Sequence, residues 1–310
     1  MPAKHMTVAA WGLLILLAAV WAGSFFFVEV ALDALTPMVV VTCRVLLGAV
    51  VLYGYVRLRG SAMPRDLATW GSLIVMGALN NALPFSLIVW AQSGIESGTA
   101  AILNATTPLF TVLLAHFLTC DERLNVHRGL GVVIGFFGVA ILIGPGVLQT
   151  VTAGSIHQIA VLAAACSYAL AGLYGRRLRG LDPAVAATGM LVGSSAMMVP
   201  LVLGWGIGEV ASLSVAVVAA VVGLGVVSTA LAYVLYFRIL ALAGATNLLL
   251  VTFLIPPGVL LLGVAFLGEQ PSPAALAGMA VIFAGLAVID GRAGSALLRA
   301  IRRKRALQSP

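Results

Sequence analysis

The chain has 310 residues, of which 62% are hydrophobic and only 9% are charged, and its formal net charge is +7. Because soluble domains carry about 25% charged residues, so few charges argue against a soluble globular protein, and the high hydrophobicity excludes a disordered chain. The composition instead favours a protein that lipid surrounds over most of its surface.

Apolar stretches long enough to cross a bilayer recur along the whole chain. A helix needs about 20 mostly apolar residues to cross a hydrocarbon core of about 30 Å. The sequence predicts such helices at residues 11–31, 37–56, 67–90, 97–118, 129–147, 156–175, 183–203, 213–237, 244–267 and 274–291. The first stretch exceeds the apolar core of about 7–15 residues in a secretory signal, so we expect it to be retained. The expected fold class is an all-α integral membrane protein with ten transmembrane helices.

The basic residues indicate how these helices are oriented. If the N-terminus is cytoplasmic, every Lys and Arg lies on the cytoplasmic side except Arg44, which falls within the second predicted helix. The outer connections then carry only acidic charges: Asp33, Glu96, Glu209 and Glu269. This distribution follows the positive-inside rule, so we expect both termini to be cytoplasmic. We interpret the basic tail at 293–310 as a segment that fixes topology and contacts anionic lipid; a regulatory or nucleic-acid-binding tail is the alternative.

The two halves of the chain repeat one pattern. Matching residues recur at offsets of 146 to 148: Pro37 and Pro183, Pro108 and Pro256, Gly131 and Gly278, and Gly138 and Gly285. We therefore expect residues 1–148 and 149–292 to be two copies of one five-helix unit. Since five is odd, the second copy must be inverted in the membrane, an arrangement that recurs in secondary transporters. The spaced glycines suit close approach between helices.

Polar residues inside the predicted helices are candidates for a substrate site, because burying them in lipid is costly. Asn80 and Asn81 lie in the middle of the third helix, although hydrogen bonding between helices would also explain them. Deep aromatic rings could stack on a flat ring or hold an ammonium, or simply pack in the core. The candidate substrate-binding residues are Trp21, Ser24, Asn80, Asn81, Tyr168, Ser228 and Tyr233.

Prolines interrupt the predicted helices in both halves of the chain. Proline removes a helical hydrogen bond and frees a carbonyl group. We interpret Pro84, Pro108, Pro256 and Pro257 as hinge or gating positions, and plain kinks are the alternative.

Two charges fall inside the first two predicted helices. Glu29 lies near the outer end of the first, and Arg44 lies about 10 Å below the outer loop in the second. We expect an intramembrane ion pair between them. In the competing interpretation, Arg44 attracts the carboxylate of a substrate.

Several classes of chemistry find no support in the sequence. Cys43, Cys120 and Cys166 lie far apart, and no Cys and His spacing typical of a metal site occurs. A nucleotide-binding loop and the patterns of hydrolytic enzymes are also missing, so we expect no enzyme, no cofactor and no metal. No carboxylate falls at the midplane, where a coupled carrier usually places one. Uniport is therefore favoured, with coupling through Glu29 or a histidine as the alternative.

Several segments resemble the drug/metabolite transporter superfamily with two EamA-type repeats. They are Trp21-Ala-Gly-Ser24, Pro37 with Arg44, Pro108 to Leu124, Gly131 to Gly138, Pro256 to Glu269, and Gly278 to Gly285. The stretch from Thr106 to His116 is similar to bacterial aromatic amino-acid exporters. The resemblance implies export of amino acids and related metabolites across a bacterial inner membrane. The sequence departs from internal symmetry at Arg44, whose counterpart in the second half is Met190.

The function that these observations predict is secondary transport of small metabolites, most of all amino acids, out of the cell by alternating access. Cationic drugs or nucleotide-sugar-like compounds are alternative cargo. A membrane enzyme and a channel are alternatives of another class; a channel would give voltage-dependent currents instead of saturable flux. The expected partners are a small-molecule substrate and the bilayer, with no nucleic acid, and the chain is expected to be a monomer or else a dimer.

Overall fold

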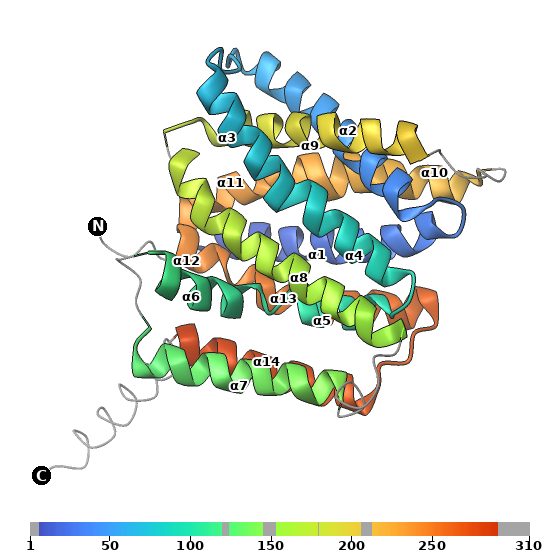
Figure 1. Ribbon diagram of the computed structural model, residues 1–310, viewed down its shortest axis with the longest axis vertical. Coiled ribbons are helices and arrows are strands. Elements are labelled where there is room, and N and C mark those ends of the chain that lie inside the picture. The colour runs from blue at the N-terminus through green and yellow to red at the C-terminus, as the bar shows by residue number, and fades with distance from the viewer. Residues whose placement is uncertain (1–5, 120–123, 145–152, 179, 206–212, 291–310) are drawn as a thin grey trace, which may run out of the picture. The chain divides into compact units, whose positions relative to one another are not determined.

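The computed structural model describes residues 6–119, 124–144, 153–178, 180–205 and 213–290, and these residues form helices and connections without any strand (Figure 1). Within them, nine helical runs are long and apolar enough to cross a membrane, and Val251–Leu267 is a shorter apolar run. The ten predicted helices are therefore present, the ninth in a shortened form. The basic tail at 293–310 lies outside the described residues.

The chain divides into two compact units, which are described separately. Unit 1 comprises Met1–Ala105 and Ala153–Pro271, and unit 2 comprises Thr106–Thr152 and Ser272–Pro310. The elements of unit 1 are α1 (Val8–Leu32), α2 (Pro37–Leu58), α3 (Leu67–Gly77), η1 (Ala78–Ala82), α4 (Leu83–Gln92), α5 (Ser97–Asn104), α8 (Ala153–Tyr174), η3 (Gly175–Leu178), α9 (Pro183–Trp205), α10 (Val215–Val222), η4 (Gly223–Leu231), α11 (Ala232–Ala243), α12 (Ala245–Leu248), α13 (Val251–Leu262) and η5 (Gly263–Leu267). Those of unit 2 are α6 (Thr107–Leu118), α7 (Val126–Ile143) and α14 (Pro273–Asp290).

Short polar residues in the connections start several of these helices. The Asp66 carboxylate accepts a hydrogen bond from the Thr69 N–H at 2.7 Å, and the Asn125 side chain accepts one from the Arg128 N–H at 2.9 Å. Each bond satisfies a backbone donor that the first helical turn leaves free. The capping hydrogen bond lowers the pKa of the exposed Asp66 carboxyl below its usual range.

Apolar side chains fill the interior of unit 1 and also cover much of its outside. Val40, Leu73, Leu191 and Leu224 are fully buried in the core. Large apolar residues on the outside, such as Val50 at 68% exposure, would be unfavourable in water but suit contact with lipid. Both the length of the apolar helices and the apolar side chains on their outer faces are therefore compatible with a bilayer.

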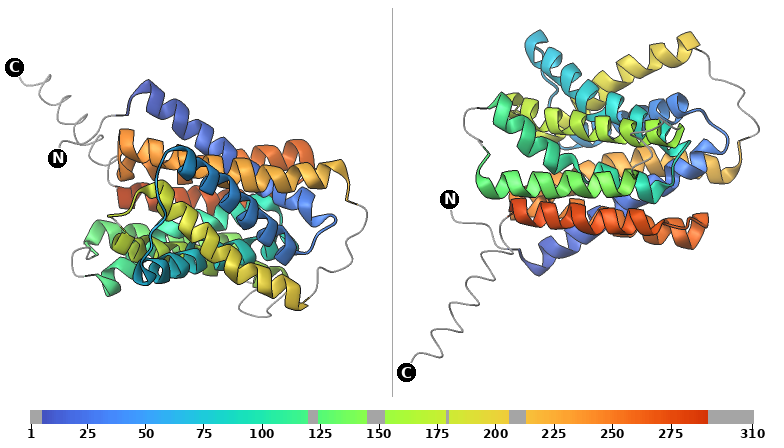
Figure 2. Two further views of the ribbon diagram at one scale, coloured as in Figure 1. Left: turned by 90° about the horizontal axis from the view of Figure 1, so that it is seen from above. Right: turned by 60° about the horizontal axis from the view of Figure 1, so that its bottom comes forward.

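Equivalent helices of the two halves pack antiparallel within unit 2 (Figure 2). A Cβ atom on Gly131 would lie 2.6 Å from the carbonyl oxygen of Gly285, and one on Gly138 would lie 2.8 Å from that of Gly278. The partner residue number falls as the residue number in α7 rises, so α7 and α14 run in opposite directions. Gly131 is also the counterpart of Gly278, and Gly138 that of Gly285, so the two contacts exchange under a two-fold axis.

Unit 1 shows the same relation between its own pair of equivalent helices. Near its middle, α2 meets α9 where Gly48 approaches Leu191, and near its C-terminal end Val56 packs on Ala184 and Val185. The two helices are therefore antiparallel, as an inverted repeat requires. Each unit takes helices from both halves, so the repeat boundary at residue 148 stays a prediction that neither unit tests.

The two halves also carry matched π-helices. η1 spans residues 78–82, and at the repeat offset of 148 these residues correspond to 226–230, which lie inside η4. π-helices are rare, and they often occur at functional sites because they widen the backbone ring and free carbonyl groups. Because η1 and η4 recur at equivalent places in the two repeats, the region between these two π-helices is the candidate for a functional site.

The prolines proposed as hinges occupy different settings. Pro84 begins α4 directly after η1, and Pro108 lies in the first turn of α6, just after the helix break at Ala105 and Thr106. Pro256 and Pro257 lie inside α13. The second-half break falls at Leu249 and Leu250, between α12 and α13, so it precedes Pro256 by more residues than the first-half break precedes Pro108. The hinge role of all four prolines stays a prediction.

The glycine contacts between α7 and α14 generate a stability prediction. Replacing Gly131 by Ala inserts a methyl group against the backbone of α14, and such overpacking costs about 1–3 kcal/mol. Gly129→Ala is the matched control on the same helix, since no atom lies within 4 Å of a Cβ there. Thermal unfolding of the detergent-purified protein should show a lower Tm for Gly131→Ala only. Equal Tm values for the two variants would contradict the close packing.

Candidate functional site

Arg44 lies in the N-terminal half of α2 and is only 8% exposed. Its Nε–H donates a hydrogen bond to the Thr229 hydroxyl of η4 at 3.0 Å, and its guanidinium carbon lies 3.8 Å from the centroid of the Phe85 ring. No carboxylate is paired with this side chain among the residues that the structure describes. The hydrogen bond and the cation–π contact stabilise the guanidinium, but no acid among the described residues compensates its charge.

Next to Arg44, three polar side chains form a hydrogen-bonded network. The Tyr233 hydroxyl accepts a bond from Asn80 Nδ2 at 2.9 Å and donates one to Asn81 Oδ1 at 2.9 Å. Tyr168 and Tyr233 both lie within electrostatic range of Arg44. Asn81 is fully buried, and its Nδ2 has no hydrogen-bond partner. Asn81 lies one helical turn before Phe85, whose ring contacts Arg44, so this unused buried donor and the guanidinium belong to one region of unit 1.

Hydroxyl groups from neighbouring helices satisfy carbonyl groups around the two π-helices. Ser167 of α8 donates to the Leu79 carbonyl of η1 at 2.7 Å, and Ser194 of α9 donates to the Gly77 carbonyl at 3.0 Å. On the other side, Ser228 of η4 donates to the Val20 carbonyl of α1 at 3.1 Å. These bonds fix both π-helices against their neighbours, which holds the polar side chains in place.

The predicted site residues in α1 join the network only through aromatic rings. The ring centroids of Trp21 and Tyr236 lie 6.1 Å apart. The Phe237 ring centroid lies 5.4 Å from that of Tyr236 and 6.0 Å from that of Tyr233. Ser24 bonds within its own helix, to the Trp21 carbonyl at 2.7 Å. The structure thus joins Asn80, Asn81 and Tyr233 in one network and places Tyr168 and Tyr233 within electrostatic range of Arg44. Trp21, Ser24 and Ser228 make their hydrogen bonds and ring contacts outside this network.

The ion pair expected between Glu29 and Arg44 is not formed. The Glu29 carboxylate accepts a hydrogen bond from Gln92 Nε2 at 3.2 Å, whereas Arg44 contacts Thr229 and Phe85. The expectation failed because helical rise gives the depth of a residue but not the direction in which its side chain turns.

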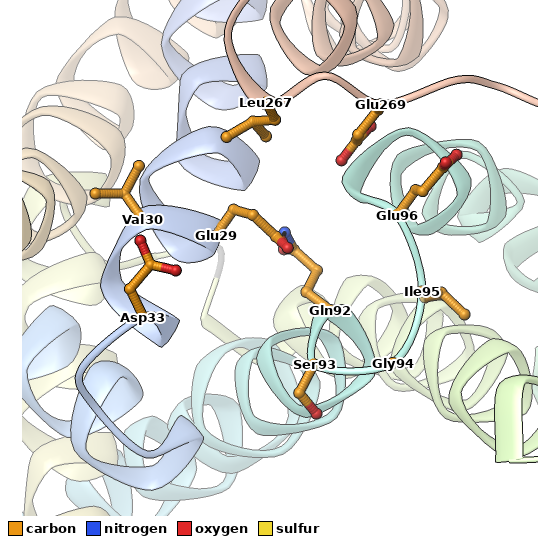
Figure 3. Close-up of a pocket in the computed structure, with 10 residues that line it drawn as sticks. All are labelled: Glu29, Val30, Asp33, Gln92, Ser93, Gly94, Ile95, Glu96, Leu267 and Glu269. Atoms are coloured by element: carbon orange, nitrogen blue, oxygen red, sulfur yellow. Dashed lines mark hydrogen bonds between the residues drawn. The ribbon is translucent and has the colours of Figure 1, made fainter.

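Glu29 lines a cavity of about 570 Å³ at one end of unit 1 (Figure 3). The cavity lies between the end of α1, the α4–α5 connection and the residues after η5. Its charged lining residues are all acidic: Glu29, Asp33, Glu96 and Glu269. Figure 1 shows the α4–α5 connection at the opposite end of unit 1 from the α2–α3 connection, which carries basic residues. We call this cavity the acidic pocket.

Two of these acids are engaged in joining the halves of the chain. The Glu269 carboxylate accepts hydrogen bonds from the backbone N–H groups of Ser97 at 2.7 Å and Gly98 at 3.2 Å, at the start of α5. In return, Glu96 accepts a longer bond from the Gln270 N–H at 3.4 Å. A carboxylate at a helix N-terminus satisfies free donors and interacts favourably with the helix dipole.

Sequence reasoning missed four contact residues of these two regions. Thr229 and Phe85 hold Arg44, Gln92 holds Glu29, and Glu269 caps α5. The available signal was spacing, since Asn81 and Phe85 are one helical turn apart in the third predicted helix and Gln92 follows seven residues later, just past the predicted end of that helix. All three are buried.

Comparison with known proteins gives a consistent result for the whole chain. The EamA-like transporter family matches residues 9–144 and again residues 156–290. A protein of Streptantibioticus cattleyicolor named "Probable terminal-alkyne amino-acid exporter" is 28% identical over 92% of this chain and 94% of its own length. "Uncharacterized transporter YoaV" of Bacillus subtilis is 23% identical over 51% of this chain. The aligned part covers 53% of YoaV, so the chain spans about half the length of that relative. One crystal structure covers 91% of this chain and 96% of its own, with a TM-score of 0.65 and 20% identity, a likeness that concerns the fold alone.

The contact between Glu269 and α5 generates a prediction. Removing the carboxylate with Glu269→Ala leaves two helix-terminal donors without their acceptor, which should cost about 1–2 kcal/mol. Hydrogen exchange of the peptide starting at Ser97 should then be about tenfold faster. Glu96→Ala is the matched control, because Glu96 accepts only the longer bond. Similar exchange in both variants would contradict the role of Glu269.

Proposed function

We infer the function of this chain from one premise: it belongs to the EamA-like transporter family. It is a multi-pass membrane transporter with a small-molecule substrate. We propose that it exports amino acids, aromatic ones among them, across a bacterial inner membrane by alternating access between the inverted repeats. The substrate site in this proposal is the region between η1 and η4, and both termini lie in the cytoplasm.

The observation that carries the proposal is the uncompensated charge of Arg44. A buried cation without an acid is costly, and so is a buried amide donor without an acceptor. One ligand group relieves both costs, namely a carboxylate that lies between the Arg44 guanidinium and Asn81 Nδ2. An amino acid carries such a group. The Tyr168 hydroxyl, which lies within electrostatic range of Arg44, supplies a further donor for the carboxylate of the substrate.

The surroundings of Arg44 fit the remainder of an amino acid. The aromatic series from Tyr233 to Trp21 provides ring faces for a flat or apolar side chain. The same ring faces attract an ammonium group. The name of the Streptantibioticus cattleyicolor relative, which refers to amino-acid export, supports the same substrate class at 28% identity.

Cationic drugs are the second candidate cargo, and the acidic pocket is the observation that favours them. The positive charge of Arg44 disfavours a cation at the centre by simple repulsion. Amino acids are therefore the preferred cargo.

The role of Arg44 generates a transport prediction. In proteoliposomes, Arg44→Gln should lower the exchange of labelled amino acid about ten- to a hundredfold, since hydrogen bonds to charged groups contribute about 1.5–3 kcal/mol. Arg59→Gln is the matched control, because Arg59 is exposed after the end of the same helix and should leave exchange unchanged. Elution at the wild-type volume in gel filtration shows that each variant is folded. Wild-type exchange in folded Arg44→Gln would contradict the proposal.

A further inference from the structure

One acid of the acidic pocket, Glu29, is held by a side-chain amide and not by a backbone N–H group. Glu269 caps α5 and Glu96 accepts from Gln270, so these carboxylates have structural partners. Asp33 is exposed at the end of α1. Glu29 is different, because it is half-buried inside the span of α1 and no basic residue lines the pocket among the described residues. A carboxylate inside a membrane span is costly and marks a functional position.

The partner of Glu29 supplies a second and independent observation. Gln92 is only 3% exposed, and its Nε2 donates both to the Phe25 carbonyl at 3.0 Å and to Glu29 at 3.2 Å. The Phe25 carbonyl can only accept, so it fixes the orientation of the amide. Gln92 Oε1 is then a buried acceptor without any donor. Figure 3 shows the amide end of Gln92 meeting the carboxylate of Glu29 inside the pocket.

A buried carbonyl oxygen beside an uncompensated carboxylate is a combination that binds a cation. The described residues contain no group of three or more His, Cys, Asp or Glu side chains that could hold a metal ion. Two oxygen donors instead suit a small monovalent ion. A proton on Glu29 would let its O–H donate to Gln92 Oε1, and a sodium ion would take both oxygens as ligands.

This pocket is separate from the region around Arg44. Phe85, which contacts Arg44, and Gln92 lie seven residues apart on one buried face of α4, which is about 10 Å of helix. The ammonium and carboxylate groups of a single amino acid are much closer together than that. An ion bound at Glu29 is therefore a second ligand, distinct from an amino acid held at Arg44.

We infer that Glu29 and Gln92 bind a small monovalent cation, a proton or sodium, whose entry from the acidic side drives substrate export. The inference rests on the proposed function, since it concerns the ion that is exchanged for the substrate. The cation binds to the Glu29 carboxylate from outside, neutralises it, and leaves on the other side after the change of access. Nothing else is consumed in the exchange.

Other titratable groups surround Glu29 and must be separated from it. Asp33 lies one turn further along α1, and Glu96 and Glu269 line the pocket from the other elements. His157 of α8 packs on Trp90 at 4.6 Å between ring centroids, outside the pocket lining. Asp33→Asn is the matched control, because it removes an acid from the same pocket without touching the bond between Glu29 and Gln92.

The test uses the full chain in proteoliposomes in two modes. Counterflow, with labelled amino acid and no ion gradient, measures the substrate site alone. Gradient-driven accumulation is measured with either a pH difference of one unit or a tenfold sodium difference. Coupling of one ion per substrate gives up to about tenfold accumulation with the correct ion. The gradient that drives accumulation, pH or sodium, identifies the cation.

We expect Glu29→Gln to keep counterflow and to lose accumulation, so that the gradient gives a ratio near one, while Asp33→Asn keeps both. Accumulation by Glu29→Gln at the wild-type level would overturn the inference, and so would a wild-type protein that neither gradient drives. Retained counterflow shows that Glu29→Gln is folded. Absence of counterflow in the wild type would instead count against the proposed function.

Discussion

A guanidinium group cannot easily enter a hydrocarbon interior, and placing one at the centre of a membrane helix costs about 2.5–3.5 kcal/mol even on insertion scales. Arg44 occupies such a place without an acidic partner, and the surrounding structure compensates for it only in part. Thr229 accepts one hydrogen bond, and the Phe85 ring provides a cation–π contact. This remaining imbalance explains why an anionic group of a substrate would be stabilised there.

The inverted repeat determines where the region around Arg44 lies in the fold. Antiparallel packing of α2 with α9, and of α7 with α14, pairs each helix with its own counterpart in the other half. Matched π-helices then bring Asn81 of η1 and Thr229 of η4 to the same central region from opposite repeats. The charges break this symmetry, because Arg44 is matched by Met190 at the repeat offset.

The sequence predicts the parts of this structure that depend on periodicity and composition. The apolar runs define the membrane helices, and the repeated glycines correctly predict close packing of the fifth and tenth helices. Asn80, Asn81 and Tyr233 were predicted as site residues and do form one network. The partner of Arg44 was not predictable, because the sequence gives the depth of Glu29 and Arg44 along their helices but not the direction in which a long flexible side chain turns. The interruption of the ninth helix was predicted at Pro256 and Pro257 but lies before them, since neighbouring helices influence where a helix is interrupted.

The central claim is that the uncompensated charge of Arg44 binds the carboxylate of the substrate. The most direct measurement is equilibrium binding of phenylalanine and of phenethylamine, which lacks only the carboxylate, to the purified protein by isothermal titration calorimetry. The account predicts that phenylalanine binds at least tenfold more tightly than phenethylamine and that Arg44→Gln removes this difference. Equal affinity of the wild-type protein for the two compounds would contradict it.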